Sequence, residues 1–253
     1  IDIDPSATRE DIITMFNRLN LTDYNLNDQE KRNSMSGEFA SLERELSDAP
    51  IWEERHLYTT TDIKRMKDVE FCASLILLYR NGIIDQTDQT ALNQAYEELQ
   101  AGYKDAETDK EAINNAIEQI SQFFVSDDVT KFLKKKTQLY TLFSVVFYMQ
   151  RNKIGITAEN LQNLKSFVEL YAVFDNDMDL TGNITDTEKK LFDWLKKYKL
   201  ESSEGLNKHT NRMIRFNVMK DFLFGLDEEL REAIKPLLSK MQAEREKMPL
   251  EPI

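Results

Sequence analysis

The stretch that decides the fold class is Val129–Gln150, VTKFLKKKTQLYTLFSVVFYMQ. It is rich in Phe, Leu, Val and Tyr, and it contains neither Gly nor Pro. The whole chain has only 7 Gly and 5 Pro in 253 residues, which leaves little material for the many turns of a β-rich protein. We therefore predict a long apolar helix here, within an all-α protein.

Helix start and end signals occur on the N-terminal side of this stretch. Asp4-Pro5 offers a cap and a first-position proline for a first helix, and Asn27–Glu30 has the spacing of a capping box that opens a short second one. Asp62 is placed to cap a strong helix that closes at Asn81-Gly82, and Thr108–Glu111 reads as a further capping box. Apolar residues recur behind each signal at helical spacing.

The same pattern continues toward the C-terminus, where one stripe centres on Phe167 and the next on Leu195. The last two helices are predicted over His209–Phe224 and Asp227–Lys247, with Pro236 kinking the second. No segment alternates with the period of two that marks a strand. The prediction is an irregular all-α bundle of about ten helices, one domain over 1–253 with subdomains 1–105 and 106–253. Because Ile1 is not Met and leads directly into a helix start, we expect a piece of a longer protein.

Charge limits the partners of the chain. With 45 acidic and 33 basic side chains the net charge is −12, which opposes indiscriminate binding to a phosphate backbone. Contact with DNA would need a local basic face on the predicted helices. The alternative interpretation of the basic residues on these helices is an ordinary solvated surface. The candidate phosphate contacts are Lys131, Lys135, Arg212 and Arg215.

Common catalytic patterns do not occur in the sequence. The two histidines, His56 and His209, lack the flanks of a nuclease or hydrolase motif, and neither a Walker loop nor a dinucleotide-binding glycine pattern is present. The single cysteine, Cys72, lies in an apolar run and is expected in the core. No apolar run is long enough for a membrane span and no signal peptide opens the chain, so we expect a cytoplasmic protein.

One stretch matches a calcium-loop pattern, Asp177–Glu188. It offers oxygen ligands at loop positions 1, 3, 5 and 12 with Gly at position 6, as calcium loops require. The alternative needs no metal, since Thr185 and Glu188 also form a capping box for the next helix. The candidate ligands are Asp177, Asp179, Thr181, Asn183 and Glu188.

The N-terminal part carries a family resemblance. Phe16–Asn20 followed by Leu26–Asn33 resembles the paired signature of GmrS-type restriction-endonuclease subunits, and Arg65–Glu70 is similar to that family's next motif. Weaker similarities lie in Phe132–Phe143 and Ser203–Asn207. The family usually has glycine where this chain has Asp23.

The resemblance implies a preceding catalytic domain with a ParB-like fold, which hydrolyses a nucleotide triphosphate with a divalent metal and acts with an HNH nuclease module on modified phage DNA. That absent domain would be the main partner, and no cofactor is expected in this portion itself. The motif residues are Arg18, Asn20, Gln29, Glu30, Arg32, Asn33, Arg65 and Asp68.

Two interpretations of the motif residues stay open. Arg18 and Arg32 can grip a carboxylate or phosphate through paired bonds, which suits a face toward the nucleotide domain. Alternatively, the motif is a buried network in which Glu30 pairs with an arginine. For the function of the chain, the leading hypothesis is a non-catalytic regulatory or substrate-sensing portion of a DNA-restriction, phage-defence protein. The alternative is a calcium-responsive helical interaction module that uses the 177–188 loop. A plain scaffold is the simplest possibility.

Overall fold

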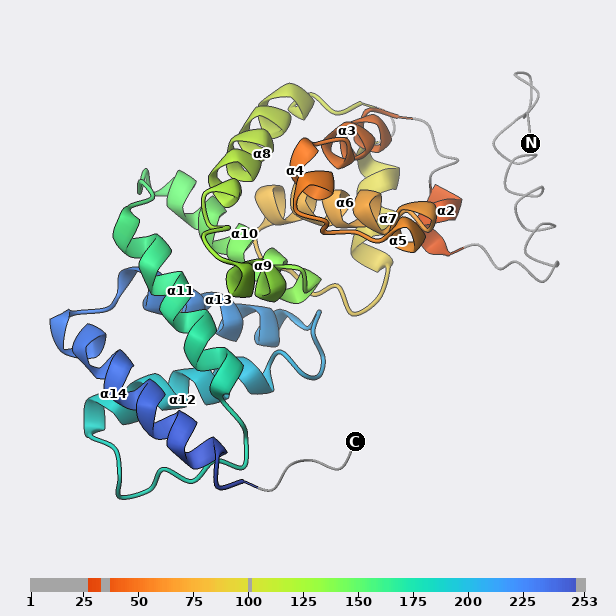
Figure 1. Ribbon diagram of the computed structural model, residues 1–253. Coiled ribbons are helices and arrows are strands. Elements are labelled where there is room, and N and C mark those ends of the chain that lie inside the picture. Colours follow the sequence, from red (N-terminus) through yellow and green to blue (C-terminus); the bar gives the residue numbers. More distant parts are fainter. Residues whose placement is uncertain (1–26, 33–36, 100–101, 249–253) are drawn as a thin grey trace, which may run out of the picture. The chain divides into compact units, whose positions relative to one another are not determined.

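A computed structural model describes residues 27–32, 37–99 and 102–248. Within these ranges the chain forms helices and turns and no strand, so the all-α prediction is confirmed (Figure 1). The predicted first helix after Pro5 lies outside the described residues. The helices are α2 (Asp28–Arg32), α3 (Glu38–Ser47), α4 (Pro50–Glu54), α5 (Thr60–Lys64), α6 (Lys67–Asn81), α7 (Thr90–Leu99), α8 (Ala106–Ser121), α9 (Asp127–Leu133), α10 (Lys136–Arg151), α11 (Ala158–Val173), α12 (Asp186–Leu200), α13 (His209–Phe224) and α14 (Glu228–Arg245).

The chain divides into two compact units. The first comprises residues 1–80 and 88–114, and the second comprises 81–87 and 115–253. The division after residue 114 falls inside α8, and a short segment after α6 belongs with the second unit. The predicted subdomain boundary at residues 105 and 106 stays a prediction.

The first unit is built around α6 and the pair α3 and α7. Cys72 is fully buried in α6 together with Ala73, Leu75 and Ile76, as expected for the single cysteine. Helices α3 and α7 contact each other, and the rings of Phe39 and Tyr96 meet edge to face with centroids 4.8 Å apart. Such a pair adds roughly 1 kcal/mol beyond the burial of its area.

The predicted helix from Asp62 to Asn81 is wrong at its start. Thr59 caps a separate short helix, α5, with Asp62 as the third residue of a capping box. The chain then breaks at Met66, whose φ of 55° is left-handed, before α6 begins. The predicted end is confirmed, because Gly82 has a φ of 74° just after the helix.

Two further boundaries differ from the predictions. Helix α8 begins at Ala106, so the expected capping box at Thr108 lies inside the helix and not at its start. The predicted helix over Val129–Gln150 is two helices, because Ser126 caps α9 and Lys135 is extended, with φ −74° and ψ 118°.

The second unit packs α9 to α14 around an aromatic core. Helix α11 contacts α9, α12, α13 and α14, while α10 contacts α9 and α13. Helix α10 buries residues on all of its sides. Helix α14 continues through Pro236 to Arg245, with Asp227 as its cap. The aromatic core consists of the rings of Phe132, Phe167, Tyr171, Tyr198 and Phe222.

No described helix combines the length and the apolar character needed to cross a membrane. Helix α10 is the most extensively buried of them, but it interrupts its apolar residues with polar ones such as Gln138 and Ser144. It is therefore a core helix of the second unit.

Candidate functional site

The motif residues of α2 point into the first unit. The side chain of Asn27 accepts from the Glu30 amide (2.9 Å), and the Glu30 carboxylate accepts from the Asn27 amide (2.6 Å). This reciprocal cap confirms the predicted start of the helix. It leaves Gln29 and Arg32, 1% and 4% exposed, on the buried side of the helix.

Arg32 is the centre of a polar network, which we call the Arg32 network. Its Nε donates to Gln29 Oε1 (3.1 Å) and its Nη1 to Asn93 Oδ1 (2.9 Å). Its Nη2 donates to Gln89 Oε1 (2.9 Å) and lies 3.8 Å from Glu70 Oε1. Each guanidinium nitrogen therefore has a partner inside the unit, as burial of a charged fork requires.

The network continues into α3 through a buried carboxyl group. Gln29 Nε2 donates to Tyr96 Oη (2.9 Å) and to Glu43 Oε1 (3.3 Å). Glu43 is fully buried, and its Oε2 has no hydrogen-bond partner among the described residues. Burial raises the pKa of Glu43 to about 7, and the Tyr96 hydroxyl and the Arg32 charge oppose that rise only in part. Glu43 therefore changes its protonation near neutral pH.

The two motifs of the family resemblance meet in the structure. Arg65 Nη1 lies 3.2 Å from Glu30 Oε2, and the Asn27 side-chain amide donates to the Arg65 carbonyl (2.8 Å). The expectation that Glu30 pairs with an arginine is confirmed. This pairing favours the buried-network interpretation for the described motif residues. Arg18, Asn20 and Asn33 lie outside the described residues.

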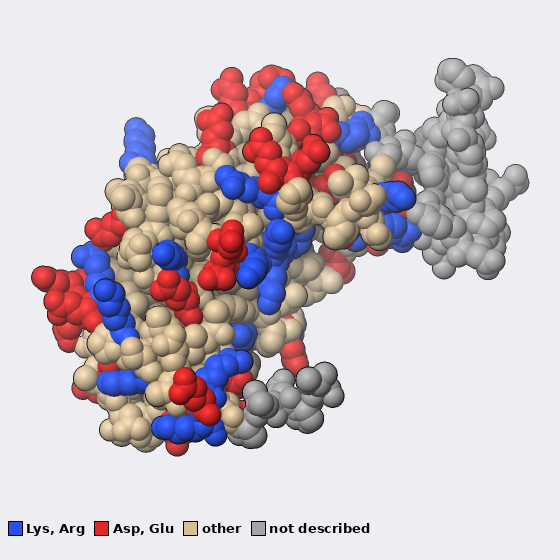
Figure 2. All heavy atoms as spheres, viewed as in Figure 1, with Lys and Arg blue, Asp and Glu red and all other residues tan. Residues whose placement is uncertain are grey.

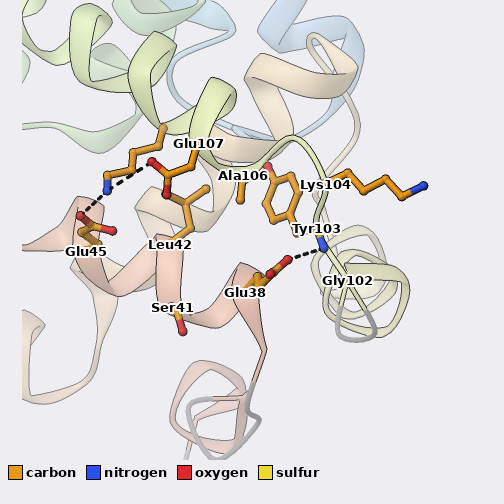
Figure 3. A pocket seen from close by; sticks show the side chains of 10 residues that line it. Glu38, Ser41, Leu42, Glu45, Gly102, Tyr103, Lys104, Ala106 and Glu107 are labelled. Atoms are coloured by element: carbon orange, nitrogen blue, oxygen red, sulfur yellow. Dashed lines mark hydrogen bonds and ion pairs between the residues drawn. The ribbon is translucent and has the colours of Figure 1, made fainter.

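A cavity of about 480 Å³ opens between α3 and the start of α8 (Figure 3). Its carboxylates already have partners, because Lys110 Nζ lies 2.6 Å from Glu45 and 3.8 Å from Glu107. The Glu38 carboxylate accepts from the Tyr103 amide (2.5 Å). Figure 2 shows acidic side chains gathered at this end of the first unit. The cavity is acidic but internally paired, so it does not define a ligand.

The two lysines predicted to contact phosphate lie at the surface. Lys131 of α9 is exposed and lies 3.7 Å from Asp128. Lys135 is exposed at the start of α10, beside the exposed Lys134. These lysines are accessible to an anionic partner.

The prediction for Arg212 must be corrected, because this residue is only 6% exposed. Its Nη1 donates to the Ile84 carbonyl (3.0 Å) and to Gln86 Oε1 (2.7 Å), and its Nη2 donates to Asn207 Oδ1 (3.0 Å). The guanidinium carbon lies 4.1 Å from the centre of the Tyr140 ring. Burial lowers the pKa of Arg212. Its role in the structure is to hold the segment before α7 against α13.

The prediction for Arg215 must be corrected for the same reason. Arg215 is 1% exposed, and its guanidinium binds the carbonyl groups of Glu201 and Leu206, the latter at 2.7 Å. Its Nε donates to Thr141 Oγ1 at 3.4 Å. Burial lowers the pKa of Arg215 as well. A phosphate could reach it only after this packing opened.

The calcium interpretation of Asp177–Glu188 stays a prediction, and the structure gives Glu188 a different partner. Both oxygens of Glu188 lie 2.7 Å from Lys240 Nζ, and Oε2 also accepts from the Thr185 amide (2.7 Å). Asp179 accepts from the amide of Thr181 (2.9 Å) in a local turn. Within the described ranges, no three His, Cys, Asp or Glu side chains converge as a metal site would require. The capping box predicted at Thr185 is the interpretation that is confirmed.

The two histidines belong to different units, and both are exposed. His56 follows α4 with a left-handed φ of 49°, and His209 opens α13, where its amide donates to Asp85 Oδ2 (3.2 Å). This contact and two from Thr87 lower the pKa of Asp85 to about 2, those from Thr87 contributing most. The interaction of His209 with Asp85 is therefore made by its backbone amide, at the start of α13.

Comparison of the chain with protein-family models, with curated proteins and with solved structures finds no match. The resemblance to GmrS-type subunits therefore stays a prediction. Assignment of function depends on the residues and on the contacts described above.

Proposed function

We propose that this chain is a helical regulatory or substrate-sensing portion of a DNA-restriction protein of phage defence, and that another domain supplies the cleavage chemistry. The observation that carries the proposal is the Arg32 network. It joins α2, which bears the family-like signature, to α6 through Glu70 and to α7 through Asn93.

The geometry of the network favours a positioning role for the signature. Since the guanidinium nitrogens of Arg32 are engaged within the first unit, Arg32 is not placed to hold a nucleotide phosphate. It instead fixes α2 against the rest of the unit. In this proposal a nucleotide-hydrolysing catalytic domain, with its triphosphate and divalent metal, is a separate partner that responds to the position of α2.

The surface lysines supply the proposed contact with DNA. Lys131 and Lys135 are exposed on neighbouring helices of the second unit, and Lys134 is exposed between them. A chain of net charge −12 repels DNA as a whole, so a small basic face would give weak contact that depends strongly on salt.

A phage-challenge assay tests the proposal. Bacteria that express the full-length protein should resist phage with modified DNA, and Arg32→Gln should abolish that resistance. Lys31→Gln is the matched control, because it removes the same charge from the neighbouring exposed position. Protection that survives Arg32→Gln in a folded protein, or an absence of protection by the unaltered protein, would contradict the proposal.

A biochemical assay tests the non-catalytic and DNA-contact parts. The purified chain should leave phage DNA intact with magnesium and a nucleotide triphosphate, yet retard it in a gel at low salt. Replacing both Lys131 and Lys135 with Gln should reduce the slope of log affinity against log salt by about 1.8, at about 0.9 per phosphate contact. DNA cleavage by the chain alone would contradict the non-catalytic part of the proposal. An unchanged salt slope would contradict the proposed DNA contact of Lys131 and Lys135.

A further inference from the structure

A group of positive charges lies near the start of α10 in the second unit. Lys199, in the last turn of α12, is half-buried, and its Nζ lies 4.4 Å from the centre of the Tyr171 ring of α11. The Tyr171 hydroxyl in turn accepts from Gln138 Nε2 (3.4 Å), in the first turn of α10. These contacts place the Lys199 ammonium near the beginning of α10, against a ring of the aromatic core.

Two further cations act on Lys199. Lys135 directly precedes α10, and Arg245 ends α14, where its Nη1 donates to the Val173 carbonyl (2.9 Å). Burial lowers the pKa of Lys199, the charges of Lys135 and Arg245 lower it further, and the carboxylate of Asp175 opposes them only in part. Lys135 and Arg245 therefore each lie close enough to repel the Lys199 ammonium.

The cluster of Lys135, Lys199 and Arg245 has no carboxylate as a direct partner. Within the described ranges none of the three forms an ion pair, whereas Lys240 of α14 lies 2.7 Å from Glu188. Asp175, the carboxylate that acts on Lys199, accepts from the Asp177 amide (3.0 Å) in a local turn. In a chain with 45 acidic and 33 basic side chains, a shortage of carboxylates cannot explain three unpaired cations in one place.

A buried cation adds to the positive field from the inner side. Arg215 is 1% exposed, its Nε donates to Thr141 of α10 (3.4 Å), and its other nitrogens bind carbonyl groups. Burial raises the pKa of Tyr171, and the Arg215 charge is among the influences that oppose this rise, so its field reaches the ring that Lys199 covers. Salt screens a buried charge less than an exposed one. The surface near the start of α10 is therefore electropositive.

A phosphate group suits this arrangement. Ammonium and guanidinium groups only donate hydrogen bonds, and those that they donate to phosphate are charge-assisted. A phosphate group offers more charge and more acceptor oxygens than a carboxylate, and its charge would relieve the repulsion among the cations. We propose that Lys135, Lys199 and Arg245 together bind a phosphate group, from a free nucleotide or from a nucleic-acid backbone. Although Lys135 also belongs to the proposed DNA contact, this inference does not rest on the role in phage defence.

Isothermal titration calorimetry of the full chain with inorganic pyrophosphate tests the site. Pyrophosphate should bind saturably at millimolar concentration or below, because it presents phosphate groups without the rest of a nucleotide. Sodium chloride at the same ionic strength should give no saturable heat, since it screens the cations without bridging them.

Helix α12 offers a matched pair of charge variants for this titration. Lys197 is exposed and lies two residues from Lys199, so it points to another side of the helix. Lys199→Gln should weaken pyrophosphate binding about tenfold, as loss of a charge-assisted contact predicts. Lys197→Gln should weaken it less than about twofold, as expected for a screened charge outside the cluster. Circular dichroism of both variants would confirm that they are folded.

Amine labelling locates the site by a second measurement. The lowered pKa of Lys199 leaves more of this amine uncharged and reactive than an ordinary lysine. Pyrophosphate should slow its acetylation by N-hydroxysuccinimide acetate about threefold or more, because a bound anion favours the charged form of the lysine. Mass spectrometry of the peptides would measure this rate, and the rate for Lys197 should stay unchanged.

Three results would overturn the inference: no saturable heat with pyrophosphate, equal weakening by Lys199→Gln and Lys197→Gln, or acetylation of Lys199 that pyrophosphate does not slow. Competition of bound pyrophosphate with deoxyadenosine triphosphate and with a duplex oligonucleotide separates the two sources of the phosphate. Stronger competition by the triphosphate indicates a free nucleotide, and stronger competition by the duplex indicates a nucleic-acid backbone. Both results support the phosphate site.

Discussion

Arg32 in the first unit and Arg215 in the second are both buried, and they bind different kinds of partner. In the first unit, Arg32 binds the side chains of Gln29, Gln89 and Asn93. In the second, two of the three nitrogens of Arg215 bind backbone carbonyl groups, after α12 and before α13. The first arrangement depends on particular side chains, whereas the second depends mainly on the path of the chain. Substitution of neighbouring residues should therefore disturb the first more than the second.

Loss of Arg215 should give the largest effect on stability. Arg215→Ala leaves the carbonyl groups of Glu201 and Leu206 unpaired and opens a cavity, at a cost of about 4 kcal/mol. Urea unfolding followed by Trp194 emission, in a Trp52→Phe background, would measure it. Lys189→Ala, at an exposed position of α12, should cost less than about 0.5 kcal/mol. A loss below about 1 kcal/mol for Arg215→Ala would show that the carbonyl groups find other partners.

Loss of Arg32 should be the next largest effect, because side chains can rearrange more readily than the backbone. Arg32→Gln should lower the free energy of unfolding by about 2–3 kcal/mol, reported by Trp52 in a Trp194→Phe background. Arg32→Lys should recover less than half of the loss, since an ammonium cannot reproduce the planar fork. If Lys31→Gln lowered the free energy of unfolding by the same amount, the loss at Arg32 could not be attributed to its buried network.

Glu43 should make the first unit sensitive to pH. Its pKa is raised to about 7 in the folded protein from 4.5, so the folded state binds the proton more tightly. The stability that this group contributes is full below its unfolded pKa and is lost as pH rises through the folded pKa.

Glu43→Gln should therefore flatten this dependence and raise stability at about pH 8 by roughly 2 kcal/mol. Thermal unfolding across the pH range would measure the change. The exposed Glu45 gives the control, with an expected change below about 0.5 kcal/mol for Glu45→Gln. An unchanged pH profile in Glu43→Gln would show that Glu43 is not the titrating group.

The smallest effect is expected at the loop before α12. Thr185→Ala should cost about 1 kcal/mol through loss of the cap. Calcium at millimolar concentration should leave the melting temperature of the unaltered protein unchanged, because Lys240 already occupies both oxygens of Glu188. A calcium-dependent rise, abolished in Asp177→Asn, would support the calcium interpretation.

Local signals in the sequence predicted much of the fold. Three predictions were correct: the cap of α2 at Asn27, the cap of α12 at Thr185 and the bounds of α13. Each of these helix ends depends on residues within about one turn of each other. The breaks at Met66 and Lys135 were missed because apolar residues keep their helical spacing on both sides of a short interruption. The periodicity of apolar residues alone cannot detect a single residue with a non-helical backbone.

The Arg32 network was less accessible to prediction. Arg32 and Asn93 are 61 positions apart, and nothing local in the sequence links them. One signal was present, however: Glu43 shares the buried stripe of α3 with Phe39, Leu42 and Leu46, at helical spacing. An acidic residue on an apolar face predicts a buried carboxyl group and therefore a network around it.

Helix α10, buried on all of its sides, has a consequence for hydrogen exchange. An amide in such a helix meets solvent only when the packing around it opens, so its exchange reports the stability of the whole cooperative unit. The amides at the C-terminal end of α12, where Leu200 is 61% exposed, should exchange through small local openings. The slowest-exchanging backbone amides of the second unit should therefore belong to the centre of α10.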